Sequence, residues 1–139
     1  MDLKVKEMRE QAQLPSRGTE GAAGLDLYCA EEIALYSGCV AKIPTGIAVE
    51  IPPHHFGLIT GRSSTALKNV LVFPTVADND YRGELFITAR FDGDGEYRVK
   101  KGDRIAQIVI QPYTKLDPTM VNELSDTARG AAGYGSTGK

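Results

Sequence analysis

The sequence predicts an all-β protein, a sandwich or barrel of short strands, and three observations favour this class. Gly and Pro interrupt the chain at short intervals, and the segments between them are apolar or alternating runs of strand length. Segments with the period of a long amphipathic helix are scarce. The chain has 139 residues, which is enough for one domain with a buried core.

Eight runs are candidate strands, taken in order along the chain. They are residues 3–6, 25–29, 39–43, 47–51, 56–60, 70–73, 85–87 and 104–110. The last run is apolar on both faces, which is typical of an interior strand. Gln107 interrupts it, and a buried amide must find a partner because leaving it unpaired costs about 1–3 kcal/mol. The partner of Gln107 is either the backbone or a ligand.

Composition and charge exclude several classes of function. The net charge of −2 gives no support to a broad nucleic-acid-binding surface, which needs clustered Lys and Arg. No apolar run approaches the length of a membrane span, and residues 1–4 lack the apolar core of a signal peptide. We therefore expect a cytoplasmic or nuclear protein. Cys29 and Cys39 have neither CxxC spacing nor nearby His residues, so free thiols are favoured over a disulfide.

Residues 62–68, Arg-Ser-Ser-Thr-Ala-Leu-Lys, are the exception to strand. Ser63 or Ser64 can cap a short helix whose body is residues 66–68. Unpaired N–H groups, two hydroxyls and Arg62 at such a helix start would suit a phosphate. The alternative is a capped turn with a solvated arginine.

Residues 78–85, Asp-Asn-Asp-Tyr-Arg-Gly-Glu-Leu, lie between two apolar runs. Polar residues at a bend between strands suit a site, because a rigid sheet positions what a loop presents. The alternative is a polar hairpin turn, with Asp and Gly present for turn chemistry. Further on, residues 128–139 are rich in Gly, Ala and Ser, so we expect a domain of residues 1–127 followed by a flexible arm. Glycine-rich backbone can wrap anionic oxygens with its N–H groups.

Five segments in order now form a recognisable set. They are Ala23-Gly24-Leu25-Asp26-Leu27-Tyr28; Gly61-Arg62-Ser63-Ser64 with Lys68; Asp78-Asn79-Asp80-Tyr81-Arg82-Gly83-Glu84; Gly102-Asp103-Arg104-Ile105-Ala106-Gln107; and Arg129-Gly130 with Gly133-Tyr134-Gly135-Ser136-Thr137-Gly138. Together they resemble the five motifs of the trimeric dUTPase family, over a stretch from about Gly21 to the C-terminus. The sequence of residues 57–64 is similar to that of retroviral-type members of the family. A retroviral member would be associated with the virion.

The resemblance implies a jelly-roll subunit and a homotrimer with three shared sites. One subunit would supply the first, second and fourth motifs, another the third, and the last the C-terminal arm. The reaction implied is hydrolysis of dUTP to dUMP and pyrophosphate with Mg²⁺. It would remove dUTP and supply dUMP for thymidylate synthesis.

The resemblance also implies a role for each matching residue. Asp78 would be the base that activates the attacking water, Tyr81 would stack on the deoxyribose, and Asp26 would hold Mg²⁺ through water. The remaining substrate-binding residues are Arg62, Ser63, Ser64 and Gln107 for the phosphates, Val76 and Ala77 for the uracil, Arg129 for the γ-phosphate, Tyr134 over the uracil, and Gly135, Ser136 and Thr137 closing over the phosphates. These residue types fit the chemistry, because attack on phosphorus needs a base, cations and N–H donors.

One departure from the family pattern keeps alternatives open. Thr75 stands where Gly is usual and Ala77 where Ile is usual, so the backbone that reads uracil differs. A nucleotide pyrophosphohydrolase with relaxed base choice is one alternative, and a non-catalytic nucleotide-binding regulator is another. The related dCTP deaminases are disfavoured, because Thr88 holds the position of their catalytic glutamate and cannot act as a general acid–base.

Overall fold

A computed structural model describes residues 1–135, which contain eleven short strands and one single-turn helix. In chain order they are β1 Lys4–Glu7, β2 Leu25–Tyr28, β3 Ile33–Tyr36, β4 Val40–Pro44, β5 Ile47–Glu50, β6 His55–Gly61, α1 Ser63–Ala66, β7 Val70–Val72, β8 Thr75–Ala77, β9 Phe86–Phe91, β10 Glu96–Val99 and β11 Arg104–Pro112. The prediction of an all-β chain with one short helix is confirmed.

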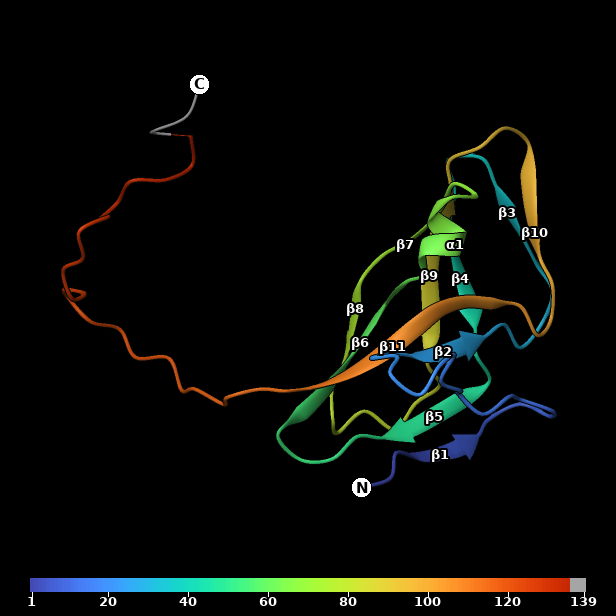
Figure 1. The fold of residues 1–139 in the computed structure, drawn as a ribbon, viewed down its shortest axis with the longest axis horizontal. Helices are drawn as coiled ribbons and strands as arrows, with labels where there is room; N and C mark the ends of the chain where they lie inside the picture. Colours follow the sequence, from blue (N-terminus) through green and yellow to red (C-terminus); the bar gives the residue numbers. More distant parts are fainter. Residues whose placement is uncertain (136–139) are drawn as a thin grey trace.

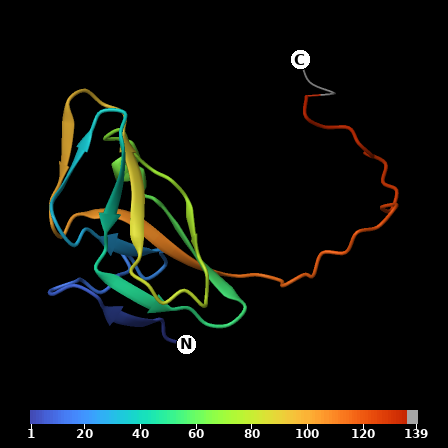
Figure 2. The same ribbon diagram turned by 180° about the vertical axis from the view of Figure 1, so that it is seen from behind.

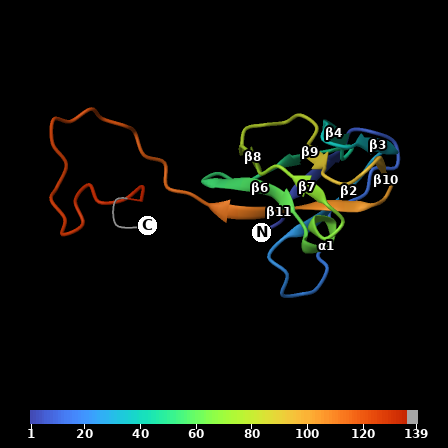
Figure 3. The ribbon, with the colours of Figure 1, turned by 90° about the horizontal axis from the view of Figure 1, so that it is seen from above.

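The strands form two main antiparallel sheets and two smaller ribbons. One sheet has the strand order β2-β11-β6-β8 and the other the order β4-β9-β7, while β1 pairs with β5 and β10 with β3. Figures 1 and 3 show the main sheets as layers of one barrel-like body. Fully buried aliphatic side chains fill the space between them, among them Leu27, Leu35, Ile43, Ile59, Ile87 and Ile108.

Strand β11 is interior, as its two-sided apolar pattern predicts. It pairs with β2 on one side and β6 on the other, and its residues Ile105, Ala106 and Ile108 are buried. A strand with a neighbour on each side has both rows of its backbone groups hydrogen-bonded, and apolar side chains on its two faces need cover above and below the sheet as well. This strand therefore brings the segment around Asp26 next to the segment around Gly61.

The helix start differs from the prediction. Arg62 is the N-cap residue and Ser63 is the first residue inside α1, so neither serine caps the helix. Thr65 provides the side-chain contact at the helix start instead, because its Oγ1 accepts a hydrogen bond from the Arg62 N–H at 3.3 Å. Thr65 is buried and its hydroxyl lies 2.8 Å from the Arg62 carbonyl and 3.3 Å from the Ile105 carbonyl. A single threonine thus fastens α1 to β11.

The chain leaves the packed body after β11. Residues 113–135 contain no strand and run as an extended segment away from the sheets, as Figures 1 and 2 show in orange and red. Apolar side chains along this segment are exposed: Leu116 by 80%, Met120 by 98% and Leu124 by 86%. The predicted division into residues 1–127 and 128–139 stays a prediction. Within the described part of the chain, no helix is long and apolar enough to cross a membrane.

The two cysteines differ in environment, and this predicts their reactivity. Both are free; Cys29 is buried and Cys39 is exposed. Burial raises the pKa of the Cys29 thiol, whose Sγ donates to the Glu31 carbonyl, so at neutral pH it stays protonated. We expect a thiol-reactive disulfide reagent to modify Cys39 rapidly in the native protein and Cys29 only after denaturation. The variant Cys39→Ser should lose the fast phase; rapid reaction of both thiols in the native wild type would contradict the prediction.

Candidate active site

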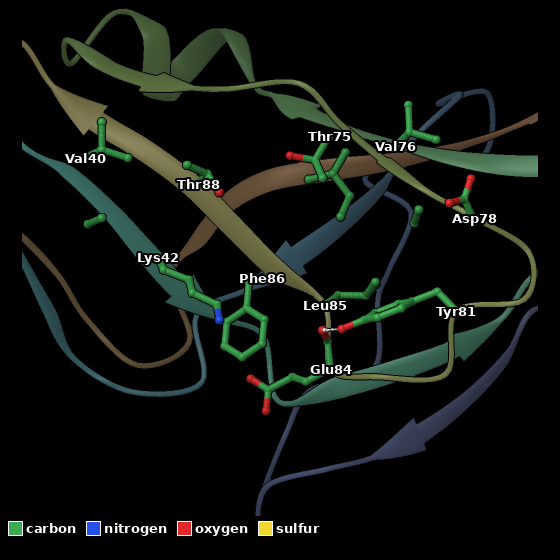
Figure 4. A pocket seen from close by; sticks show the side chains of 13 residues that line it. Val40, Lys42, Thr75, Val76, Asp78, Tyr81, Glu84, Leu85, Phe86 and Thr88 are labelled. Atoms are coloured by element: carbon green, nitrogen blue, oxygen red, sulfur yellow. Dashed lines mark hydrogen bonds between the residues drawn. The ribbon is translucent and has the colours of Figure 1, made fainter.

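A pocket of about 480 Å³ opens beside the end of β8, and the segment 78–85 forms one of its walls. Val76, Ala77, Asp78 and Tyr81 all line it, together with residues of β4 and β9. Figure 4 shows Asp78 and Tyr81 at one side of this pocket and Lys42 and Thr88 at the other. The structure therefore brings together four residues that the sequence singled out.

The bend after β8 holds Tyr81 in a defined orientation. The Tyr81 N–H donates to the Asp78 carbonyl at 3.2 Å and closes a turn, while the Tyr81 hydroxyl donates to the Glu84 carbonyl at 3.0 Å. Gly83 is required here, because a Cβ at this position would overlap the Tyr81 hydroxyl and ring. The glycine thus lets the aromatic ring lie across its own loop. Asp78 remains exposed to solvent in the pocket, where a water can reach it.

Strand β8 positions the residues that differ from the usual family pattern. Ala77 lies opposite Gly57 on β6, and Thr75 opposite Ile59. Ala77 is buried, whereas Val76 is 57% exposed and Thr75 is exposed too, so β8 meets the core only at Ala77. The Thr75 hydroxyl donates to the Phe73 carbonyl at 3.3 Å.

A second cluster of polar side chains lies at the other end of β6. Arg62 follows that strand, and its Nε lies 3.0 Å from Asp26 Oδ1. Arg104 Nη1 lies 3.5 Å from Asp26 Oδ2, and the Arg104 carbonyl accepts from Arg62 Nη1 at 3.1 Å. Asp26 is 7% exposed, so its buried charge is balanced by the two guanidinium groups. Five strand rises separate Arg62 from Gly57, which is about 16 Å.

Gln107 completes the cluster from the centre of the sheet. It lies between Asp26 on β2 and Thr60 on β6, and its Nε2 donates to the Gly61 carbonyl at 3.1 Å. Its side chain crosses directly over Gly24, where a Cβ would overlap Gln107 Oε1. The glycine before Leu25 is therefore required by close approach of the amide. Of the two partners expected for Gln107, the structure shows the backbone one.

Ser63 and Ser64 are exposed on the single turn of α1, beside Arg62. Arg62 Nη1 donates to Ser64 Oγ at 3.3 Å. A second pocket, lined by Arg62, Ser64, Lys68 and Arg104, opens at this end of the molecule. Among the described residues around this opening, the three cations outnumber the one carboxylate, Asp103, and with the Ser64 hydroxyl they suit an anion with several oxygens.

The donor set fits a metal ion held through water better than one held directly. No group of three or more His, Cys, Asp or Glu side chains gathers anywhere in residues 1–135. The carboxylate of Asp26 has an arginine paired with each of its oxygens. Mg²⁺ keeps several of its waters and is commonly held by one or two carboxylates plus substrate phosphates, which agrees with this arrangement.

The residues of the C-terminal segment lie apart from both clusters. Arg129 Nε donates to the Ala132 carbonyl at 2.7 Å in a turn of the extended segment, and Tyr134 is fully exposed. Gly135 has a φ of +81°, which favours glycine. Ser136 and Thr137, which the sequence also selects, lie outside the described residues. A single chain thus presents the candidate residues in three separate groups.

Two residues of the second cluster, Arg104 and Thr65, have no predicted role from the sequence. Arg104 was grouped with its motif but given no role, although it neutralises Asp26 and supports Arg62 through its carbonyl. Thr65 was read only as part of the helix. The available signal for Arg104 was its place directly before the apolar residues Ile105 and Ala106, but only the register of β11 against β2 puts it near Asp26.

A jelly-roll body with a phosphate-suited cluster and a carboxylate–tyrosine pocket defines a nucleotide-hydrolysing class of protein, and the comparisons agree. The family model dUTPase matches residues 10–138. The chain is 42% identical to a deoxyuridine 5'-triphosphate nucleotidohydrolase of Paramecium bursaria Chlorella virus 1, over 98% of this chain and 97% of that protein. It is 42% identical to the enzyme of the same name from Hydrogenobaculum, over 99% of each chain.

Solved structures agree with the fold as well. The dUTPase of Staphylococcus bacteriophage 80alpha, solved with dUpNHpp, superposes with a TM-score of 0.93 at 31% identity over 99% of each chain. A variant dUTPase from S. aureus phage phi11, described with a structural Mg(II) ion, gives a TM-score of 0.84 at 27% identity, over 88% of this chain and 98% of that one. The chain belongs to the dUTPase family, as the five motifs predict, and the predicted jelly-roll fold is confirmed.

Proposed function

We propose that this protein hydrolyses dUTP to dUMP and pyrophosphate. The observation that carries the proposal is the joint presence of Asp78 and Tyr81 in one pocket of a chain that matches curated deoxyuridine triphosphate nucleotidohydrolases over nearly its whole length. In this reaction a water oxygen bonds to the α-phosphorus and the bond to the oxygen that bridges to the β-phosphorus breaks. Pyrophosphate leaves, and Asp78 takes a proton from the water.

We propose roles for the other residues from their positions. Tyr81, held by the Glu84 carbonyl, stacks on the deoxyribose, and Val76 and Ala77 face the uracil. Arg62, Ser63, Ser64 and Gln107 hold the phosphates, and Arg62 is already oriented by Asp26. Fixed cations and donors stabilise the charge of the transition state because they need no reorganisation during the reaction.

Mg²⁺ fits the cluster as a cofactor held through water by Asp26, and when bound it would neutralise charge on the phosphate oxygens. Asp26 is mostly buried and each of its oxygens is paired with an arginine, so it would reach a hydrated ion only when one of these pairs opens. The arm residues Arg129, Tyr134 and Gly135, with Ser136 and Thr137, are proposed to close over the nucleotide and exclude water.

We propose that the working form is a homotrimer with shared sites. Two features support it. The candidate residues lie in three groups within one chain, with about 16 Å along β6 between Gly57, which pairs with Ala77, and Arg62. The extended segment also exposes Leu116, Met120 and Leu124, which is costly for apolar side chains without a neighbouring molecule. The predicted cytoplasmic or nuclear localisation and the likeness to retroviral members stay predictions.

A second candidate function, hydrolysis of several deoxynucleotides, is favoured by one observation. The strand that faces the pocket carries Thr75 and the small side chain of Ala77. A smaller wall residue leaves room for a substituent on the base, and pockets discriminate a single methyl group by only about 10- to 200-fold.

Pyrophosphate release with Mg²⁺ separates these functions. We expect turnover of dUTP to exceed that of dTTP, dCTP and UTP at equal concentration by at least about tenfold. Comparable turnover of several nucleotides would support the relaxed enzyme. Binding of dUTP with no turnover would contradict both enzymes and support a regulatory role.

A further inference from the structure

Arg9 lies in the segment between β1 and β2, outside all five motifs, yet its backbone is firmly placed. The N–H groups of Met8 and Arg9 both donate to the Gly46 carbonyl, at 2.7 and 3.2 Å. Gly46 has a φ of +74°, and a Cβ there would come within 2.9 Å of Ala12 Cβ and 3.4 Å of Arg9 Cβ. The turn that carries Arg9 is therefore docked against the loop between β4 and β5.

The guanidinium of Arg9 is hydrogen-bonded to the mostly buried carboxylate of Glu84. Arg9 Nε lies 2.9 and 3.0 Å from the two oxygens of Glu84, whose side chain is only 12% exposed. Arg9 Nη1 also reaches Glu31 Oε2 at 3.3 Å, but Glu31 is exposed. The hydrogen bond to Glu84 raises the pKa of Arg9 above its ordinary value, so Arg9 stays cationic. Removing the cation would leave a carboxylate with little solvent and no guanidinium.

Glu84 in turn holds Tyr81. Its backbone carbonyl accepts the Tyr81 hydroxyl at 3.0 Å, as the dashed line in Figure 4 shows, and Glu84 and Tyr81 line the same pocket as Asp78. The next residue is anchored from the core side, since the Leu85 N–H donates to the Ile47 carbonyl and the Leu85 carbonyl accepts from Thr45. Arg9 thus holds the side chain of Glu84, while Ile47 and Thr45 hold its backbone through the neighbouring Leu85.

We propose that Arg9 is a positioning residue for the reaction: by fixing the Glu84 carboxylate it keeps the Glu84 carbonyl under the Tyr81 hydroxyl and the tyrosine ring in place beside Asp78. The proposal rests on the proposed function, in which Tyr81 contacts the sugar. A loosened ring distinguishes deoxyribose from ribose less well, whereas loss of stability alone would lower the rates with both sugars equally.

The experiment compares Arg9→Met with wild type, measuring kcat/KM for dUTP and for UTP. We expect the ratio of the two values to fall about tenfold, the size of one lost hydrogen bond. Arg98→Met is the matched control, because Arg98 is a half-exposed arginine paired with two glutamates, Glu96 and Glu32, on the β3–β10 ribbon. For Arg98→Met, the ratio of kcat/KM for dUTP to kcat/KM for UTP should stay within twofold of the wild-type ratio.

Two further variants keep the test decisive. Arg9→Lys retains the charge and the stem but loses the paired contact of Nε with both carboxylate oxygens, so we expect it to lower the dUTP/UTP ratio less than Arg9→Met does. It replaces Arg9→Met in the test if that variant folds poorly. Tyr81→Phe removes the hydroxyl that Glu84 accepts, and Arg9→Met should lower the ratio little further in that background, because both changes break one chain of contacts.

The outcomes separate this inference from the proposed function. An unchanged dUTP/UTP ratio in both Arg9 variants, or full additivity with Tyr81→Phe, would overturn the positioning role while leaving dUTP hydrolysis intact. A wild-type protein that does not turn over dUTP would instead overturn the proposed function, before any variant is compared.

Discussion

Asp78→Asn is expected to lower kcat for dUTP hydrolysis by about 10²–10⁴-fold, the contribution of a positioned general base. Asparagine keeps the size and polarity of the side chain but cannot accept the proton of the attacking water. Asp78 is exposed in the pocket, so the fold should be unaffected. The measurement is steady-state pyrophosphate release, with dUTP affinity and thermal midpoint determined on the same samples.

Asp80→Asn is the control for this prediction. Asp80 lies in the same bend, is also exposed and does not line the pocket. Its rate should stay within a few-fold of wild type, because exposed charges contribute little. A near-wild-type rate for Asp78→Asn, or an equal loss in both variants, would show that Asp78 is not the base.

Ending the chain after Ala128 is expected to preserve the fold but to lower kcat/KM for dUTP by about 10²-fold or more. Of the residues removed, 129–139, those described are exposed except the half-buried Gly133, and none of them belongs to the core. They include Arg129, a cation proposed to meet the γ-phosphate, and loss of one well-placed electrostatic donor alone costs about 10²–10³-fold. Circular dichroism and the thermal midpoint would confirm that the body is intact.

Mixed trimers test whether the arm acts on another subunit's site. Co-expression of the truncated chain with the Asp78→Asn chain should restore part of the activity, because some sites then combine an intact Asp78 with an intact arm. The parental proteins assayed separately provide the baseline. An unaffected truncated protein would exclude closure by the arm, and absence of recovery in verified mixed trimers would exclude shared sites.

Local pattern was enough to predict most strands and the motif residues. The two-sided apolar run of residues 104–110 predicted β11, and the Pro44 and Gly46 that interrupt the chain predicted β4 and β5 as separate strands. The strands β3, β8 and β10 were missed. They have three or four residues each, and β10 is a strand because it pairs with β3, about 60 positions earlier in the chain. Such pairing depends on non-local contacts that a short apolar pattern does not encode.

The helix cap shows the same division on a smaller scale. The sequence offered two serines as caps, and both are good cap residues. The structure uses Thr65 because β11 lies close enough for its hydroxyl to reach the Ile105 carbonyl, 40 positions away. Tertiary contact therefore decided which hydroxyl caps and left both serines exposed beside Arg62.

The sequence by itself determined the all-β class, the family and the residues that carry its motifs, because each depends on residue types at fixed local spacing. Only the tertiary structure decided which charges meet: that Asp26 is balanced by Arg62 and Arg104, that Gly24 makes room for Gln107, and that Arg9 grips Glu84 from 75 positions away. Strand register and loop docking bring these groups together, and both follow from the whole fold rather than from any single segment.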